Sequence, residues 1–330
     1  MCDKSSNIHL SSHKNFHLSN TKIEVNKLNF LLILGLIFAF QHHEIHDALT
    51  ITYENEPIMT ISRSDLSSPT PGLQLADMKK LSQVSEQLDK QIRKEAVNAV
   101  IDDGGRIVPE QPGIELNKKA FMEQLLTYYY QSGPSMINAP TRRIYPRVDS
   151  EILAAIKNKR IGHYVTYFNS RNKERSHNIF LAAEAIDNYV VFPGEVFSFN
   201  KTVGIRTKAR GYLPAPIIVK GELSEGIGGG ICQVSSTLFN AVDRSGMKIL
   251  ERYSHSKRVR YVPPGRDATV SWYGPDFTFK NEYNEPILIK AKAINGMMIV
   301  LVFSSEEIIA QPNKIPSTDN KLPPETKITN

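Results

Sequence analysis

Three consecutive glycines, Gly228–Gly230, stand directly before an amphipathic segment that reads ICQVSSTLFNAVDR. Glycine reaches backbone conformations that are closed to other residues, so this run predicts a sharp turn that another segment approaches closely. Gly246 supplies a stop signal, and we predict a helix from Cys232 to Ser245. The apolar stripe of this helix consists of Ile231, Val234, Leu238, Ala241 and Val242. The sequence therefore predicts a packed helix that begins at a cysteine.

Cys232 is the only cysteine after residue 2. A thiol in the first turn of a helix lies beside unpaired backbone N–H groups and the positive end of the helix dipole, and both favour the thiolate. An unpaired cysteine is either a reactive group or a small buried hydrophobic residue. Both interpretations stay open for Cys232 on the sequence alone.

A nucleophilic cysteine needs a base and a group that orients the base. His255 stands at the start of a predicted strand, Arg258–Val262, and Asp267 follows shortly after. In the catalytic interpretation Cys232 attacks, His255 is the base, Asp267 orients its ring, and the N–H groups of Gly230 and Cys232 bind the developing oxyanion. In the structural interpretation Cys232 fills a pocket, His255 satisfies a buried hydrogen bond and Asp267 caps a turn. The less favoured alternatives are His163 and His177 as base and Asp276 as orienting group.

The amino-terminal region is typical of an export signal. Residues 1–27 are polar, and the apolar run Leu28–Phe40 follows Lys27. As a helix, thirteen residues span about 20 Å, which is short of a membrane core of about 30 Å. The residues after the run lack the small-x-small pattern of a signal-peptidase site. We expect a cell-membrane protein with a single amino-terminal anchor and the bulk outside, or a secreted protein if the segment is cleaved.

Composition excludes several classes of function. The net charge of +6 comes from 40 basic and 34 acidic residues along the chain, without the dense basic and aromatic run of a nucleic-acid groove. GIGGG lacks the spacing of a nucleotide-binding fingerprint. HHEIH, at 42–46, lacks the spacing of a zinc motif. We expect no cofactor, no metal and no nucleic acid.

The expected fold class is α+β throughout. We assign 1–46 to the tail and anchor, 47–145 to a small α+β module, 146–304 to a mixed α+β domain and 305–330 to a disordered tail. The module is predicted to contain two strands within 49–61, helices near 75–92 and 117–130, a hairpin around Asp102–Gly105, and a proline-marked link at 138–146.

The larger domain is predicted to combine helices with several antiparallel strands. Its expected helices are 150–157, 176–188 and the glycine-led one. Its expected strands, besides Arg258–Val262, lie at 163–168, 196–199, 268–272, 287–293 and 297–303. Asn295-Gly296 between the last two strands is a strong hairpin turn.

Several long motifs, taken in order, resemble the VanW family. They are RSHNIFLAAEAIDN, PGEVFSFNKTVGIRTKARGY, GGGICQVSSTLFNA and ERYSHSKRVRYVPPGRDATV. The resemblance covers about 161–303. GRIVPEQPGIEL, within 49–140, is similar to a peptidoglycan-binding module that precedes such domains. Phe239 stands where tyrosine is usual, and Asp243-Arg244 interrupts a more apolar helix face.

The resemblance implies an exported envelope protein of a Gram-positive-type bacterium with an accessory role in wall biology or glycopeptide resistance. Its expected partners are peptidoglycan or stem peptides, and the membrane through the anchor. Wall binding is the leading hypothesis. A cysteine amidase, peptidase or transpeptidase acting on wall peptides is the alternative, and a non-catalytic scaffold in wall assembly is the third.

Four side chains are assigned to ligand binding: Arg175, Arg206, Gln233 and Ser236. A guanidinium suits a peptide carboxylate. For the two arginines an ion pair with Glu184, Asp187 or Glu195 is the favoured alternative. Tyr212 and Trp272 could stack on sugar rings, but core packing is the favoured alternative for both.

Overall fold

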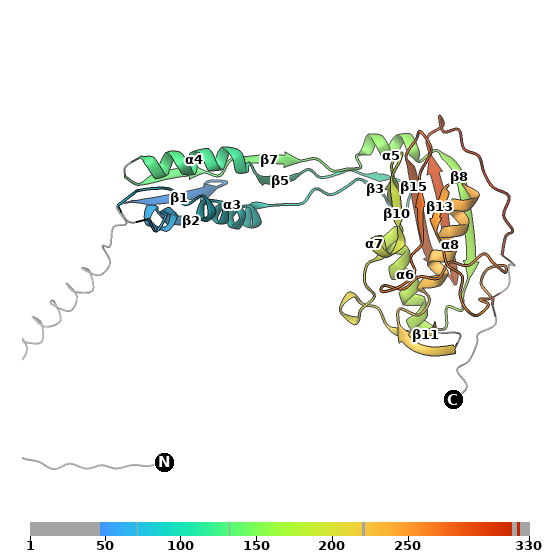
Figure 1. Cartoon of the computed structure of the whole chain (residues 1–330). Helices are drawn as coiled ribbons and strands as arrows, with labels where there is room; N and C mark the ends of the chain where they lie inside the picture. The colour runs from blue at the N-terminus through green and yellow to red at the C-terminus, as the bar shows by residue number, and fades with distance from the viewer. Residues whose placement is uncertain (1–46, 71, 132, 220–221, 319–321, 324–330) are drawn as a thin grey trace, which may run out of the picture. The chain divides into compact units, whose positions relative to one another are not determined.

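The computed structural model describes residues 47–70, 72–131, 133–219, 222–318 and 322–323 (Figure 1). The expected anchor and the histidines around it lie outside this range. The described chain divides into two compact units. Unit 1 runs to Ile92 and resumes over Leu116–Thr141, whereas unit 2 comprises Arg93–Glu115 and the chain from Arg142 onward. The hairpin expected in the amino-terminal module thus groups with the larger unit.

Unit 1 places a three-stranded sheet against helices. The sheet has the order β2-β1-β6, with β1 (Ala48–Tyr53) antiparallel to β2 (Glu56–Ser62) and parallel to β6 (Ser135–Asn138). Glu54 and Asn55 both have positive φ, which confirms the predicted hairpin turn. The short helix α2 (Arg63–Leu66) follows β2.

Two longer helices complete the core of unit 1, as the sequence predicts. They are α3 (Met78–Ile92) and α4 (Lys118–Tyr130), and Asn117 caps α4 by accepting the N–H of Ala120. Leu81 and Leu88 of α3 and Phe121 and Leu125 of α4 are fully buried together with the sheet residues. The expected link at 138–146 is not irregular, because β7 (Thr141–Ile144) pairs there with β5 (Gly113–Leu116).

The main sheet of unit 2 has four antiparallel strands. Their order is β8 (Lys159–Tyr167), β16 (Met297–Ser304), β15 (Ile287–Ile294) and β9 (Tyr189–Val191). The turn between β15 and β16 has positive φ at Asn295 and Gly296, which confirms the predicted hairpin. Alternate residues of β15 face opposite sides: Ile287 and Ile289 belong to one core and Leu288 to another.

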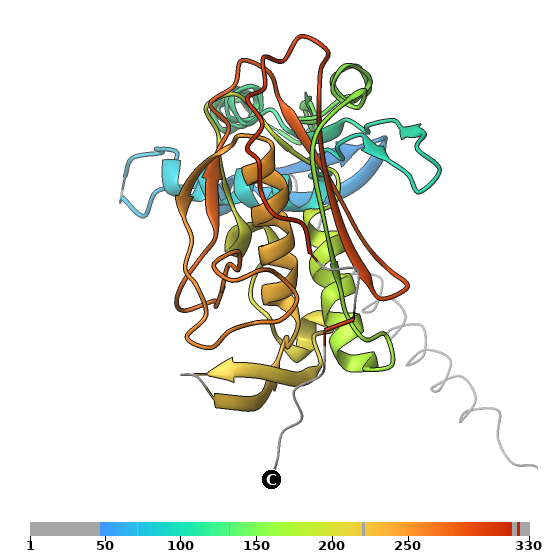
Figure 2. The same ribbon diagram turned by 90° about the vertical axis from the view of Figure 1, so that its right-hand side faces the viewer.

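Helices cover both faces of this sheet. α6 (Lys173–Ile186) and α8 (Ile231–Arg244) lie side by side on one face (Figure 2). The other face packs against α5 (Ser150–Ile156) and the hairpin of β3 (Val100–Ile101) and β4 (Ile107–Val108). Eleven residues of α8 are buried, on all sides of the helix. α8 is therefore a core element.

A second, smaller sheet lies beyond α8 in the order β10 (Val196–Ser198), β14 (Thr278–Lys280), β13 (Lys248–Glu251). The helix α7 (Phe199–Val203) and the short 3-10 turn Lys208–Arg210 follow β10. The hairpin of β11 (Pro214–Val219) and β12 (Glu222–Ile227) leads into the glycine turn.

The strands expected at Arg258–Val262 and Ala268–Trp272 are wrong. The segment between β13 and β14 is irregular except for a single bridge between Tyr253 and Thr269. For the second of these strands the physical reason is that side chains of α8 take backbone bonds at 266–268. Ala268 N–H donates to Ser236 Oγ at 2.9 Å, and Asn240 Nδ2 donates to Arg266 O at 2.8 Å.

Residues 305–318, part of the tail that the sequence predicts to be disordered, are held by contacts with the rest of unit 2. Ile308 is 3% exposed, Asn313 N–H donates to Arg244 O at 3.0 Å, and Thr318 Oγ1 donates to Val165 O at 2.7 Å. These contacts place the segment along unit 2.

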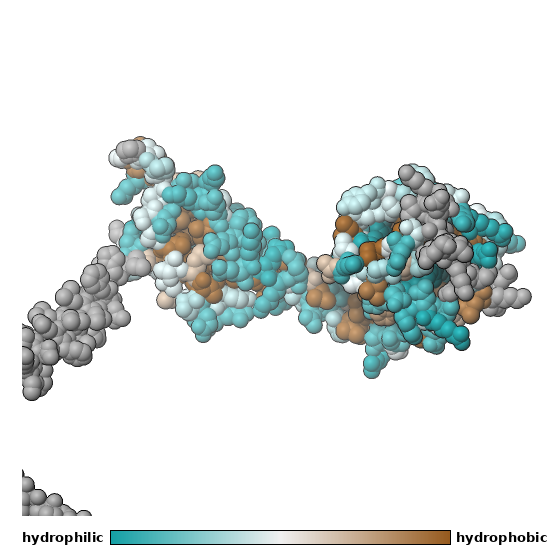
Figure 3. Space-filling model, turned by 90° about the horizontal axis from the view of Figure 1, so that it is seen from below, coloured by the Kyte–Doolittle hydropathy of each residue, from teal (hydrophilic) through white to brown (hydrophobic). Residues whose placement is uncertain are grey.

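None of the helices in the described part of the chain combines the length and the apolar character that crossing a membrane requires. Figure 3 shows one face of the protein, where apolar side chains form small patches among hydrophilic ones. Scattered apolar groups of this kind are ordinary for a protein surface.

Candidate active site

The glycine turn fits α8 closely against its neighbours. Gly230 caps the helix with φ +107, and a Cβ there would lie 2.9 Å from Cγ1 of Ile179 and 3.0 Å from Cγ of Arg175. A Cβ on Gly229 would lie 2.6 Å from the Ala215 carbonyl oxygen. Only glycine allows this backbone conformation and these approaches to α6 and β11.

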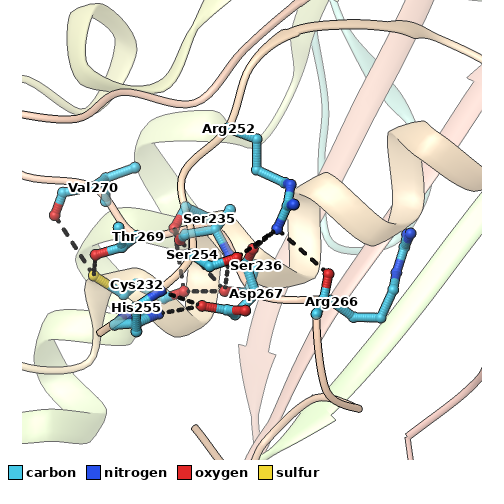
Figure 4. A network of polar contacts seen from close by, with 12 residues as sticks. Cys232, Ser235, Ser236, Arg252, Ser254, His255, Arg266, Asp267, Thr269 and Val270 are labelled. Atoms are coloured by element: carbon cyan, nitrogen blue, oxygen red, sulfur yellow. Dashed lines mark hydrogen bonds and ion pairs between the residues drawn. The ribbon is translucent and has the colours of Figure 1, made fainter. Parts of the chain in front are cut away.

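Cys232 is the second residue of α8, and it is partly exposed. Its Sγ lies 3.8 Å from Thr269 Oγ1 and 3.5 Å from the Val270 carbonyl oxygen. His255 lies close enough to this sulfur for its ring and its charge to act on the pKa of the thiol. Figure 4 shows His255, Thr269 and Val270 gathered around the thiol. The sulfur is thus neither sealed in apolar packing nor remote from a base.

His255 is held in turn by Asp267. Nδ1 of His255 lies 2.7 Å from Asp267 Oδ2, and the His255 backbone N–H donates to the same oxygen at 2.6 Å. The two side chains are only 6% and 11% exposed. With Nδ1 occupied by Asp267, Nε2 is the ring atom left for the thiol. The structure therefore brings the three residues together: His255 is hydrogen-bonded to Asp267 and lies beside the Cys232 thiol, although it is on an irregular segment and not on a strand.

Electrostatics favour a charged pair at this site. Burial by itself raises the pKa of the Cys232 thiol, but the hydrogen bond and positive charge of His255 outweigh it, and the pKa lies below its usual value. Burial lowers the pKa of His255, but the bonds to Asp267 and Cys232 prevail and raise the pKa to about 9. Burial raises the pKa of Asp267, but its bonds to His255 lower it overall. These shifts favour a thiolate beside an imidazolium over the neutral pair.

Neither the Gly230 nor the Cys232 N–H makes a hydrogen bond within the described part of the chain, whereas the next N–H, of Gln233, donates to Gly230 O at 3.0 Å. These are the two donors that the sequence assigns to an oxyanion. Their position at the start of a helix suits a negative charge.

Two of the predicted ligand contacts are structural. Gln233 is 1% exposed; its Nε2 donates to Thr166 Oγ1 at 2.9 Å, and its Oε1 accepts from Arg175 Nη2 at 2.6 Å. Ser236 is fully buried, and its Oγ donates to Cys232 O at 2.7 Å and accepts the Ala268 N–H. We therefore assign both to the support of the site and not to ligand contact.

The guanidinium of Arg206 is buried. Its Nη1 and Nη2 atoms are closed to solvent and have no hydrogen-bond partner among the described residues, and its guanidinium lies 5.7 Å from the centre of the Phe199 ring. Burial lowers its pKa, partly offset by the nearby Tyr212, Cys232 and Asp276. As placed, the guanidinium acts on the site through its charge.

Two of the three acids considered as ion-pair partners are engaged elsewhere. Asp187 binds Lys290 at 2.7 Å, and Glu195 binds Arg147. Of the side chains considered for stacking on sugars, Tyr212 is buried in the core at 3% exposure. Trp272 is 41% exposed, which is more than core packing predicts.

The alternative catalytic partners lie in other contacts. His177 bonds through Nε2 to Gly211 O at 3.0 Å. His163 is on β8, where burial first and then the charges of Arg160 and Arg244 lower its pKa. Asp276 accepts from Ser198 Oγ at 2.5 Å and from the Asn200 N–H at 2.8 Å.

Tyr261 was missed by the sequence analysis. It packs against the main core of unit 2, and burial, with the charge of Cys232 next, raises its pKa against a lowering effect of the Ser236 side chain. No spacing rule relates a tyrosine in an irregular segment to a helix residue. Within the described residues, no group of three or more His, Cys, Asp and Glu is placed to hold a metal ion.

The chain belongs to the VanW-like family, whose model, described as VanW like protein, matches residues 174–303 and so includes all three site residues. The chain is 56% identical over 295 residues to "Uncharacterized protein YoaR" of Bacillus subtilis (strain 168), covering 89% of this chain and 97% of that protein. It is also 31% identical over 110 residues to "Vancomycin B-type resistance protein VanW" of Enterococcus faecalis (strain ATCC 700802 / V583). That match covers 32% of this chain and 40% of that protein. No solved structure matches the chain.

Proposed function

We propose that unit 2 is a cysteine-dependent acyl-transfer domain that cleaves or exchanges amide bonds in peptides of the bacterial cell wall. One observation carries this proposal: His255 is hydrogen-bonded to the Asp267 carboxylate and lies beside the partly exposed Cys232 thiol, whose pKa it lowers. A wall-binding module does not need a nucleophile, a base and an orienting carboxylate in one chain of contacts. The geometry therefore favours the enzyme over the binding hypothesis that ranked first on sequence.

In the first half of the reaction, the Cys232 thiolate attacks the carbonyl carbon of an amide bond. The oxygen that gains negative charge is stabilised by the free N–H groups at the start of α8. The His255 imidazolium gives its proton to the leaving nitrogen as the C–N bond breaks. The products are a thioester on Cys232 and a free amine.

In the second half, water or an amine attacks the thioester while His255 takes up the proton of the attacking group. The C–S bond breaks and the thiolate is restored. Water as the attacking group makes the domain an amidase or peptidase, whereas an amine makes it a transpeptidase. Asp267 keeps the ring of His255 in one orientation through both halves.

The setting in the cell envelope is part of the proposal. The expected anchor at Leu28–Phe40 puts units 1 and 2 outside the membrane. The relative from Enterococcus faecalis is named as a vancomycin resistance protein, and this name supports a role in wall biology. Unit 1 contains GRIVPEQPGIEL only in part, since Arg93–Glu115 group with unit 2, and wall binding by this region remains an expectation.

The test uses the full chain and soluble stem peptides released from purified cell wall. Wild-type protein is expected to release or exchange peptide fragments, and Cys232→Ala is expected to lose this activity while still binding wall in a pull-down. An acyl-enzyme trapped on Cys232 and seen by mass spectrometry would fix the nucleophile. Wall binding without turnover by the wild type would leave the non-catalytic binder, and neither property would leave the scaffold.

A further inference from the structure

The irregular segment 255–261 is fixed at both ends. His255 at one end bonds to Asp267 beside the Cys232 thiol, and Tyr261 at the other end packs against the main core of unit 2. Val259, midway, is 8% exposed and packs in the main core of unit 2. The segment therefore has a defined path along the edge of the site.

Three cationic side chains project from this segment. Lys257, Arg258 and Arg260 are all exposed, and none of them makes an ion pair or a hydrogen bond with another described residue. Elsewhere in unit 2 exposed basic side chains often have acidic partners, such as Lys248 with Glu282 and Lys292 with Asp103. We call Lys257, Arg258 and Arg260 the basic rim.

The basic rim adds positive charge without acidic partners beside a site in which the Cys232 thiol and the Asp267 carboxylate lie next to His255. Arg206 has no ion-pair partner among the described residues, and its charge acts on Cys232. A cluster of like charges at the edge of a partly enclosed site concentrates ligands of opposite charge.

We infer that the basic rim is a substrate-binding surface that selects peptides with free carboxylates near the acyl group that Cys232 attacks. This inference rests on the proposed acyl-transfer activity. A carboxylate fits because guanidinium and ammonium groups bind it with charge-assisted hydrogen bonds, and arginine does so with two parallel bonds. A peptide is the occupant because only a ligand with an acyl group makes use of the neighbouring thiol.

The size of the effect follows from the exposure of the rim. Exposed ion pairs are weak one by one, at about 0.2–1 kcal/mol each. Three acting together are expected to give about a tenfold preference for the anionic peptide at low salt. Salt screens such contacts, so the preference is expected to shrink as ionic strength rises.

The experiment compares two forms of one substrate: stem peptides from purified wall with their carboxylates free, and the same peptides with the carboxylates converted to amides. Wild-type protein is expected to prefer the free form about tenfold in kcat/KM. In the variant Lys257→Glu, Arg258→Glu, Arg260→Glu this ratio is expected to fall to about one or below, mainly through KM. The variant Lys257→Gln, Arg258→Gln, Arg260→Gln removes the same positive charges without adding negative ones, and it replaces the glutamate variant if that variant does not fold.

A matched control reverses three exposed lysines of unit 1, namely Lys79, Lys90 and Lys119. It changes the net charge equally and is expected to keep the wild-type ratio. Equal use of both peptides by the wild type, or an unchanged ratio in the rim variant, would overturn the inference. Inorganic polyphosphate that binds at the rim and inhibits turnover of the two peptide forms equally would also overturn the inference, because the rim would then be a general anion site.

Binding separates this inference from the proposed function. Cys232→Ala protein cannot turn over, and its affinity for the two peptides is measured by calorimetry. Preference for the free carboxylates in binding, with no Cys232-dependent turnover in the wild type, would retain the rim and refute the enzyme. Turnover without any preference would retain the enzyme and refute the rim.

Discussion

The backbone N–H and the ring Nδ1 of His255 both bond to one oxygen atom of Asp267, at 2.6 and 2.7 Å. This double contact fixes the position of the residue and the orientation of its ring at once. His255 does not lie on a strand, so its position depends on the Asp267 carboxylate and not on a sheet. Asp267 is itself positioned by α8, because the neighbouring Ala268 bonds to Ser235 and Ser236.

The thiol of Cys232 is expected to react quickly near neutral pH. Because His255 lowers its pKa, alkylation by iodoacetamide should reach half its maximal rate below pH 8.5, the usual midpoint of a free thiol. His255→Ala is expected to move the midpoint upward and slow alkylation at pH 7 about tenfold or more. A Cys2→Ser background leaves Cys232 as the single thiol. An unchanged profile in His255→Ala would refute the charged pair.

Asp267→Asn is expected to lower kcat/KM by about 10²-fold or more, because an amide cannot stabilise the imidazolium. The matched control is Asp276→Asn, which removes a carboxylate bound to Ser198 and Asn200. It is expected to reduce stability while the activity of the folded fraction stays near that of the wild type. Equal losses of activity in both variants would argue against the orienting role of Asp267.

The pH dependence of stability is expected to reveal the His255–Asp267 pair once Cys232 is replaced by Ala. In the wild type the pKa of His255 is raised on folding to about 9 from an ordinary value of 6.5, because Asp267 and Cys232 together outweigh burial, and Cys232→Ala removes the contribution of Cys232. Asp267 contributes to that shift, so the pair's stabilisation is fully present below pH 6.5 and is lost as pH rises toward the folded value. In the wild type, the lowered pKa of the Cys232 thiol gives a slope of opposite sign, which masks this loss.

Urea unfolding of Cys232→Ala at several pH values between 6 and 9.5 measures this effect. The midpoint is expected to fall across this range and to fall less when Asp267→Asn is added. A midpoint that rises with pH in the single variant would contradict the assignment.

Gly230→Ala is expected to destabilise unit 2 by about 3 kcal/mol, because it combines strain at φ +107 with contacts of 2.9–3.2 Å to α6. Gly194→Ala is the control, since Gly194 has φ +78 and nothing within 4 Å of a new Cβ. That change should cost only about 1 kcal/mol, the backbone strain alone. Denaturant unfolding measures both, and equal costs would show that close packing at the glycine turn contributes little.

Arg206→Met is expected to leave the free energy of unfolding unchanged or to raise it by about 1 kcal/mol, because a buried guanidinium without hydrogen-bond partners is costly. The same change should slow alkylation of Cys232 at pH 7, because a positive charge that acts on the thiolate is lost. Arg210→Met, at an exposed neighbouring position, is the control for both measurements. Lower stability with unchanged reactivity would assign Arg206 a purely structural role.

Much of the fold could be predicted from local signals. The turns at Glu54-Asn55 and Asn295-Gly296 and the starts of α4 and α8 follow from turn and cap residues that act over a few positions. The strand expected at 268–272 failed because side chains of α8 take backbone bonds at 266–268, and a sequence pattern does not show which partner takes them. The strand expected at 258–262 is absent as well. The expected disorder of the tail failed over 305–318, because the contacts of this segment are with distant residues.

The sequence by itself determined that a cysteine starts a packed helix after a turn that only glycines can form, because these are properties of neighbouring residues. It also supplied the candidates His255 and Asp267, with other partners left open. Only the tertiary structure decided among them, because it places His255, hydrogen-bonded to Asp267, beside Cys232 of α8 on an irregular segment held by Ser235, Ser236 and Asn240. The loss of Gln233 and Ser236 as ligand contacts has the same physical origin: burial depends on what packs around a side chain and not on its place along the helix.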